Sequence, residues 1–208
     1  MDIITQKFNE WTAGKGPKEA RISVFEHTRD IPYAIIAAMR DPKVGPAALI
    51  ERNHGSCNPK HVLLGELFTR LGYKVKYANY AFNWDDPAVK YPPELRALTK
   101  KIPSGNHLAC KVLIDGRWVL VDATWDPPLK KAGFPVNEGW DGVSDTKNAV
   151  TPISGVPSQR GEVLHDTIEE RVQYDTGLRA RYTEEQKAAY LEFVEKLNAW
   201  LETLRRNK

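Results

Sequence analysis

The sequence predicts a mixed fold of helices and strands, because three tracts of the chain differ in the spacing of their apolar residues. Residues 17–72 place apolar side chains three and four positions apart, which is typical of amphipathic helices. Residues 73–125 contain short runs rich in β-branched and aromatic residues, which favours strands. Near the C-terminus, residues 183–206 return to helical spacing. We expect a single domain over residues 1–208, with its core at about 17–127.

The helical tract contains one helix with especially clear signals. Pro17 suits the first turn of an early helix, and residues 47–52 form a second, short one. The clearest helix is predicted to open at Asn58-Pro59 and to stop at Gly72, a residue that favours the position after a helix. Its apolar face is made of Val62, Leu63, Leu67, Phe68 and Leu71.

The strand tract is predicted to contain a hairpin. Residues 75–82 form a first apolar run, and runs at 108–114 and 117–123 follow it. Asp115-Gly116 separates the last two runs, and Asp-Gly between apolar runs is a strong signal for a two-residue hairpin turn. A short helix is expected near residues 93–100, in the connection before the hairpin.

The remaining chain is predicted to contain a long connection and a final helix. Residues 128–161 are rich in Gly and Pro, and we expect them to form either a lid or an irregular wrap over the core. In the final helix, at about 183–206, Thr183 and Gln186 have the spacing of a capping box. Its apolar stripe is expected to pack on the core.

Composition excludes several classes of protein. The formal net charge of +3, from 30 Lys and Arg against 27 Asp and Glu, is too small to indicate nucleic-acid binding. No apolar run approaches the length needed to span a membrane, and no targeting segment is evident, so we expect a cytoplasmic protein. Two cysteines are too few for a disulfide framework or a zinc site made only of cysteine.

The two cysteines have different predicted roles. Cys57 lies at the start of the clearest helix, where unpaired N–H groups and the helix dipole stabilise a thiolate. Gly55 allows a sharp turn before it and leaves room for a substrate. Cys110 instead alternates with apolar residues on one face of a predicted strand, so we expect it to fill the core.

The hairpin offers a base and an orienting group for a cysteine nucleophile. If Asp115 and Gly116 form the turn, His107 lies diagonally from Asp122 on the same face, about 7 Å away at the backbone. Asp122 stands among residues that favour burial, and a buried carboxylate needs a partner. We therefore expect a hydrogen bond between the two side chains.

These residues together resemble the transglutaminase-like superfamily. The matching segments are Gly55-Ser56-Cys57 with the helix that follows, then His107, and then residues 112–126. The segment Arg29-Asp30-Ile31-Pro32-Tyr33 also resembles the helix end that precedes the core of that family. The resemblance covers residues 20–127. It implies an α+β, papain-like fold in which the cysteine helix packs on an antiparallel sheet.

The same resemblance implies a catalytic triad and a reaction. Cys57 would be the nucleophile, His107 the general base and then acid, and Asp122 the orienting carboxylate. The expected enzyme acts on amide bonds of a peptide or protein through a thioester, without a metal or organic cofactor. Hydrolysis, of the peptidase or deamidase type, is the preferred outcome.

Two departures from the family pattern leave the substrate class open. Many members have an aromatic residue where this chain has Ala109, and an acidic residue where it has Asn58-Pro59-Lys60. The oxyanion-hole side chain is not identified by the resemblance. Asn53 and His54 are candidates because they are close to the cysteine in sequence.

Other functions remain open at the level of sequence. His54, Cys57 and His61 have spacings of three and four, which a metal site on one helix would use, but Pro59 argues that His54 is not on the helix. Arylamine N-acetyltransferases share the triad, yet usually have Arg-Gly-Gly before the cysteine. Protein cross-linking by amine transfer and a non-catalytic peptide-binding module are the remaining alternatives.

Overall fold

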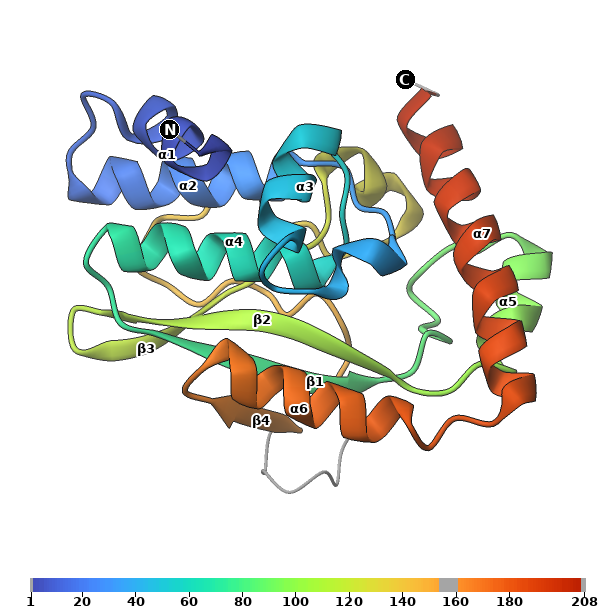
Figure 1. Cartoon of the computed structure of the whole chain (residues 1–208). Helices are drawn as coiled ribbons and strands as arrows, with labels where there is room; N and C mark the ends of the chain where they lie inside the picture. The colour runs from blue at the N-terminus through green and yellow to red at the C-terminus, as the bar shows by residue number, and fades with distance from the viewer. Residues whose placement is uncertain (1, 154–160, 207–208) are drawn as a thin grey trace.

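The structure, a computed structural model, describes residues 2–153 and 161–206. It has an α+β fold, as predicted, with helices against a four-stranded antiparallel sheet of order β3-β2-β1-β4 (Figure 1). The elements in chain order are α1 (Ile3–Thr12), α2 (Pro17–Asp30), η1 (Ala37–Arg40), α3 (Gly45–Arg52), α4 (Cys57–Arg70), β1 (Val75–Phe82), α5 (Pro93–Thr99), β2 (Gly105–Ile114), β3 (Arg117–Val121), η2 (Pro127–Ala132), β4 (Glu162–His165), α6 (Ile168–Arg179) and α7 (Glu184–Arg206).

The β2–β3 hairpin forms in the predicted register. Ile114 pairs with Arg117, and the turn residues Asp115 and Gly116 have φ of 49° and 78°. Positive φ at both central residues is the requirement of a type I′ turn, whose twist matches the two strands. This turn fixes which residues of β2 and β3 face each other, including those at the far end of the hairpin.

The central element of the larger core is α4. It packs on β1 and β2, while α2 and α3 cover its opposite side (Figure 1). The helix begins at Cys57, one residue before the predicted start, and Ser56 is its N-cap residue. It ends as predicted: Gly72 has φ of 87°, and its N–H donates to the Thr69 carbonyl at 2.9 Å. Burial on all sides fixes the position of its first turn.

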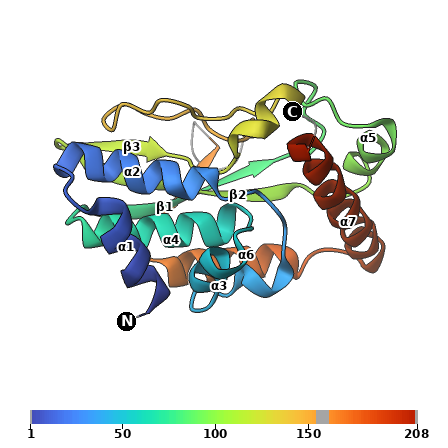
Figure 2. The same ribbon diagram turned by 90° about the horizontal axis from the view of Figure 1, so that it is seen from above.

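A second, aromatic-rich core lies under α7. The capping box forms as predicted, since Thr183 N–H donates to Gln186 Oε1 at 3.0 Å and Gln186 N–H to Thr183 Oγ1 at 3.2 Å. The predicted stripe packs there, with Leu197 and Leu201 fully buried. Figure 2 shows α7 next to α5 at one end of the molecule, and the two helices are in contact.

The C-terminal helix is also tied to the segment that precedes α3. The Asn198 side chain accepts a hydrogen bond from Ile35 N–H at 2.9 Å and donates to its carbonyl at 3.0 Å. Arg205 makes a bidentate ion pair with the buried Asp126, at 2.8 and 2.9 Å, and donates to the Tyr33 carbonyl. The helix is therefore bonded to two distant parts of the chain.

Sequence reasoning left α1, η1, η2, β4 and α6 unassigned. The Gly- and Pro-rich tract contains η2 and then irregular chain, and its residues 154–160 lie outside the described part. Its described portion lies along β3, where Thr146 N–H donates to the Leu120 carbonyl at 2.9 Å. No helix in the described ranges is long and apolar enough to cross a membrane.

Candidate active site

Cys57 is the first residue of α4, and its side chain is partly exposed. The chain reaches it through Gly55, whose N–H donates to the Pro32 carbonyl and whose carbonyl accepts from Ala34 N–H. A Cβ at Gly55 would lie 2.4 Å from Leu49 Cδ1. Gly55 is thus required for close packing against α3, rather than for the space beside the sulfur that the sequence suggested.

His107 and Asp122 form the expected pair at the end of the hairpin. His107 Nε2 lies 2.7 Å from Asp122 Oδ2, and both side chains are almost completely buried. The carboxylate also accepts hydrogen bonds from Ala149 N–H at 2.8 Å and from the Thr124 hydroxyl at 2.6 Å. Burial disfavours its ionised form, but the charge and hydrogen bond of His107, and then the nearby His61, hold the pKa of Asp122 well below its usual range.

Cys57 and His107 perturb each other. Because Nε2 of His107 is bonded to Asp122, Nδ1 is the ring nitrogen left for the thiol. Burial disfavours imidazolium, but the charge and hydrogen bond of Asp122, and then the interaction with Cys57, raise the pKa of His107 to about 10. Burial opposes the thiolate as well, yet His107, the Leu108 N–H and Arg171 lower the pKa of Cys57. These directions favour a thiolate–imidazolium pair.

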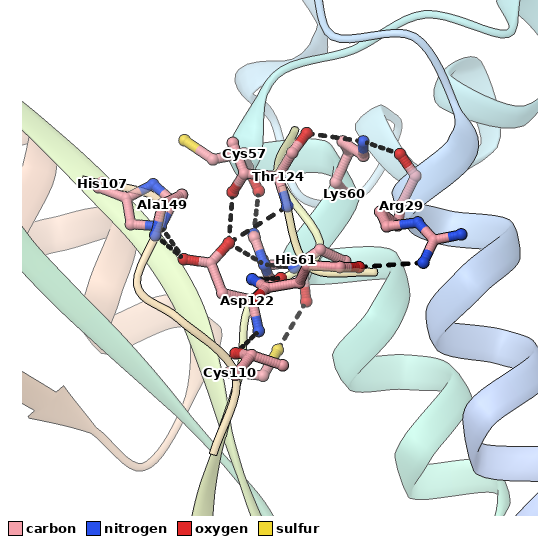
Figure 3. Close-up of polar contacts among 12 residues, drawn as sticks. Arg29, Cys57, Lys60, His61, His107, Cys110, Asp122, Thr124 and Ala149 are labelled. Carbon is pink, nitrogen blue, oxygen red and sulfur yellow. Dashed lines mark hydrogen bonds and ion pairs between the residues drawn. The ribbon is translucent and has the colours of Figure 1, made fainter. Parts of the chain in front are cut away.

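A second buried histidine, His61, connects the nucleophile helix to the end of the hairpin. Its Nδ1 lies 2.8 Å from the Cys57 carbonyl, and its Nε2 accepts a hydrogen bond from Ala123 N–H at 3.0 Å (Figure 3). A carbonyl can only accept and an amide N–H can only donate, so His61 is the neutral Nδ1–H tautomer. The lone pair of His61 Nε2 is therefore used by the Ala123 N–H. Because the ring is neutral, the 3.5 Å distance from Nε2 to Asp122 Oδ1 does not represent an ion pair.

Lys60 is the second residue in this region that sequence reasoning did not assign to the site. Its side chain is completely buried, and Nζ donates to the carbonyls of Arg29, Ile31 and Thr124 at 2.8–2.9 Å. Burial lowers the pKa of Lys60 to about 7, and the charges of Asp126, Asp30 and Asp122 oppose that shift. The lysine joins the end of α2, α4 and the chain after β3.

A cleft opens between the two cores at the thiol. Aromatic side chains make much of its wall, and its charged groups include three arginines and one aspartate. The described residues that line it include Tyr33, Arg40, Ser56, Cys57, Asn58, Phe82, Trp84, His107, Trp125, Arg171, Asp175, Arg179, Tyr182 and Tyr190. In Figure 3 the Cys57 sulfur points toward the His107 side and away from Lys60.

The two residues proposed for the oxyanion hole do not line this cleft. Asn53 ends α3 with φ of 52°, in the left-handed region, and borders a separate hollow near Trp11. His54 lies 3.3 Å from Glu202 of α7 through its Nε2. Both are close to the cysteine in sequence, but neither lines the cleft that contains the thiol. The first backbone N–H groups of α4 lie at the cysteine itself.

The other cysteine has the predicted packing position. Cys110 is fully buried in the core between α4 and the sheet, and its thiol donates to the His61 carbonyl at 3.2 Å. Burial raises the pKa of this thiol. Within residues 2–153 and 161–206, no group of three or more His, Cys, Asp or Glu side chains is arranged to hold a metal ion.

Comparisons with known proteins give only weak structural likeness. No protein-family model matches the chain, and no curated protein matches it. One solved structure with a similar arrangement is described as a "Putative Cysteine Protease from Cytophaga hutchinsonii"; the TM-score is 0.41 and the identity 18%. The match covers 62% of this chain and 38% of that one, so the present chain corresponds to less than half of that protein.

Proposed function

We propose that this protein is a cysteine-dependent enzyme that cleaves amide bonds through a thioester, with Cys57, His107 and Asp122 as its triad. The observation that carries the proposal is the buried 2.7 Å pair of His107 and Asp122 at the edge of a cleft that also contains Cys57. A thiol at a helix start, a histidine and a carboxylate that orients it form the arrangement needed for nucleophilic catalysis.

In the first half of the proposed reaction, the Cys57 thiolate attacks the carbonyl carbon of an amide. The C=O electron pair moves to the oxygen, which the N–H groups at the start of α4 stabilise. His107 then gives its proton to the leaving amine, the C–N bond breaks, and a thioester on Cys57 remains.

In the second half, neutral His107 takes a proton from water as the water attacks the thioester. The C–S bond breaks, the acid is released and the thiolate–imidazolium pair returns. Asp122 holds the ring in one orientation and stabilises its charged form throughout, because Nε2 stays bonded to Oδ2. An amine in place of water would give acyl transfer by the same steps.

Alkylation with iodoacetamide across pH tests the nucleophile. We expect the wild-type Cys57 peptide, identified by mass spectrometry, to react well below the pH of about 8.5 at which a free thiol ionises. His107→Ala is expected to move this profile back toward that value. A wild-type profile like that of a free thiol, unchanged in His107→Ala, would show that the proposed function is wrong.

A second assay separates the acyl acceptors. The protein is incubated with a library of peptides that carry glutamine and internal amide bonds, with and without an excess of a primary amine. Ammonia or new peptide termini indicate hydrolysis, whereas incorporation of the amine indicates transfer. Cys57→Ala is the control, and equal turnover in that variant would exclude this site as the source of activity.

A further inference from the structure

Arg171 lies under the cleft, in a helix that the sequence did not predict. The residue comes from α6 and is 3% exposed. Its Nη1 donates to Asn58 Oδ1 at 2.8 Å and its Nε to Asn79 Oδ1 at 3.2 Å. Asn58 directly follows Cys57 in α4, so the guanidinium is bonded to the residue next to the candidate nucleophile.

The charge of Arg171 has no close counter-ion among the described residues. Both hydrogen-bond acceptors are neutral amides, and within residues 2–153 and 161–206 no carboxylate oxygen lies within 4.0 Å of its nitrogens. The nearest acidic candidate, Asp175 on the same helix, pairs instead with Arg179 at 2.7 Å. Buried charges are normally paired, because desolvation of an isolated ion is very costly.

Two groups of the cleft wall can carry a negative charge near Arg171: Asp175 and the Cys57 thiolate. Cys57, Asn58 and Arg171 line it together. The titratable and charged groups around the guanidinium include Cys57 on α4, Arg40 on η1, His165 on β4, and Asp175 and Arg179 on α6. Asp41, just after η1, lines a neighbouring hollow together with Arg171. Burial lowers the pKa of His165, which favours its neutral form. Three arginines against Asp175 and Asp41 leave positive charge in excess, and the Cys57 thiolate is a further anion that can offset it.

We propose that Arg171 provides an anion-stabilising position beside the nucleophile, first for the Cys57 thiolate and then for the oxyanion. When the sulfur electron pair forms the C–S bond, the C=O pair moves to oxygen, so the negative charge passes from sulfur to oxygen within the field of one guanidinium. This inference rests on the proposed function and extends it, because it assigns an electrostatic role to a residue outside the triad.

The test compares a neutral and an anionic reagent of nearly the same size. Alkylation of Cys57 by iodoacetamide and by iodoacetate is followed between pH 4 and 10, in wild type, Arg171→Gln, Arg171→Met, Arg171→Lys and Arg181→Gln. Arg181 is an exposed arginine just beyond α6, so its variant controls for a change in net charge alone. Circular dichroism and thermal melting identify the variants that fold. Two neutral substitutions, Arg171→Gln and Arg171→Met, are included so that the test can still be made if one of them does not fold.

The expected result is a loss of positive potential at the sulfur in the neutral variants. A unit charge within roughly 10 Å at an effective dielectric constant of about 20 changes a pKa by about one unit. In Arg171→Gln and Arg171→Met we therefore expect the thiol profile to move up by about one pH unit and the iodoacetate-to-iodoacetamide rate ratio to fall about tenfold. Arg171→Lys, which keeps the charge, is expected to stay within about threefold of wild type, and Arg181→Gln to match it.

Two different failures can be told apart. Folded neutral variants that keep both the wild-type profile and the wild-type rate ratio would overturn the role of Arg171 and leave the proposed triad intact. A tenfold fall of the ratio in folded Arg171→Lys would also overturn it, because the charge is still present. If Cys57 of the wild-type protein is alkylated with the pH profile of a free thiol, the proposed function is wrong, and the role inferred for Arg171 is wrong with it.

Discussion

Asp122→Asn is the substitution that most directly tests the chemistry of the site. Asp122 is 1% exposed and accepts hydrogen bonds from His107, Thr124 and Ala149. An asparagine of nearly the same shape has one oxygen acceptor in place of two and carries no charge. The change removes the charge that stabilises the His107 imidazolium, while the packing around the site is largely kept.

The size of the effect follows from the pKa of His107. The difference between about 10 in the folded protein and the ordinary 6.5 is about 3.5 units, and the charge of Asp122 is the largest of its favourable causes. Removal of one partner of a buried ion pair typically costs about 3–5 kcal/mol. A cost of that size corresponds to a fall of about 10³ in the rate of amide cleavage.

The assay is again the pH profile of Cys57 alkylation, together with turnover of an amide substrate. In wild type we expect thiolate reactivity to begin well below the pKa of a free thiol, with the thiolate paired to imidazolium up to about pH 10. In Asp122→Asn this range is expected to disappear, and reactivity to rise only near the pKa of a free thiol. A folded Asp122→Asn protein that keeps the wild-type profile would refute the reasoning.

Three further substitutions test the surroundings of the site. Lys60→Met is expected to lower the free energy of unfolding by about 3 kcal/mol or more, measured with urea, because three buried carbonyls lose their donor; an unchanged unfolding midpoint would contradict this. Arg205→Ala leaves the buried Asp126 without its bidentate partner and is expected to cost about 3–5 kcal/mol, whereas Arg206→Ala, at an exposed position, should cost little. Cys110→Ala is expected to lower the melting temperature but to leave the alkylation profile of Cys57 unchanged, and a shifted profile would show that the two thiols are coupled.

The pairing of His107 with Asp122 was predictable because local chemistry determines it. The Asp115-Gly116 turn sets the register of the hairpin, and that register alone places residue 107 diagonally from residue 122. Each step uses interactions between neighbours in sequence, such as turn geometry and strand alternation. The same is true of Gly72 at the end of α4.

Other parts of the site depend on contacts between distant segments, so the sequence gives little sign of them. Arg171 reaches Asn58 across more than a hundred residues, from a helix with only a weakly developed apolar face. His61 was noticed for its spacing, but its neutral bridging role follows from bonds to two different elements. Asn53 shows the converse, since proximity in sequence did not bring it to the cleft.

The bonds made by α7 have a consequence for how substrate preference can change. Asn198 and Arg205 hold the backbone at Ile35 and Tyr33, and both of those residues line the cleft, as does Tyr190 of α7. This wall of the cleft is thus carried by the C-terminal helix, whereas the proposed triad is carried by α4 and the hairpin. Under the proposed function, selection for new substrates can remodel the wall through α7 while Cys57, His107 and Asp122 stay in place.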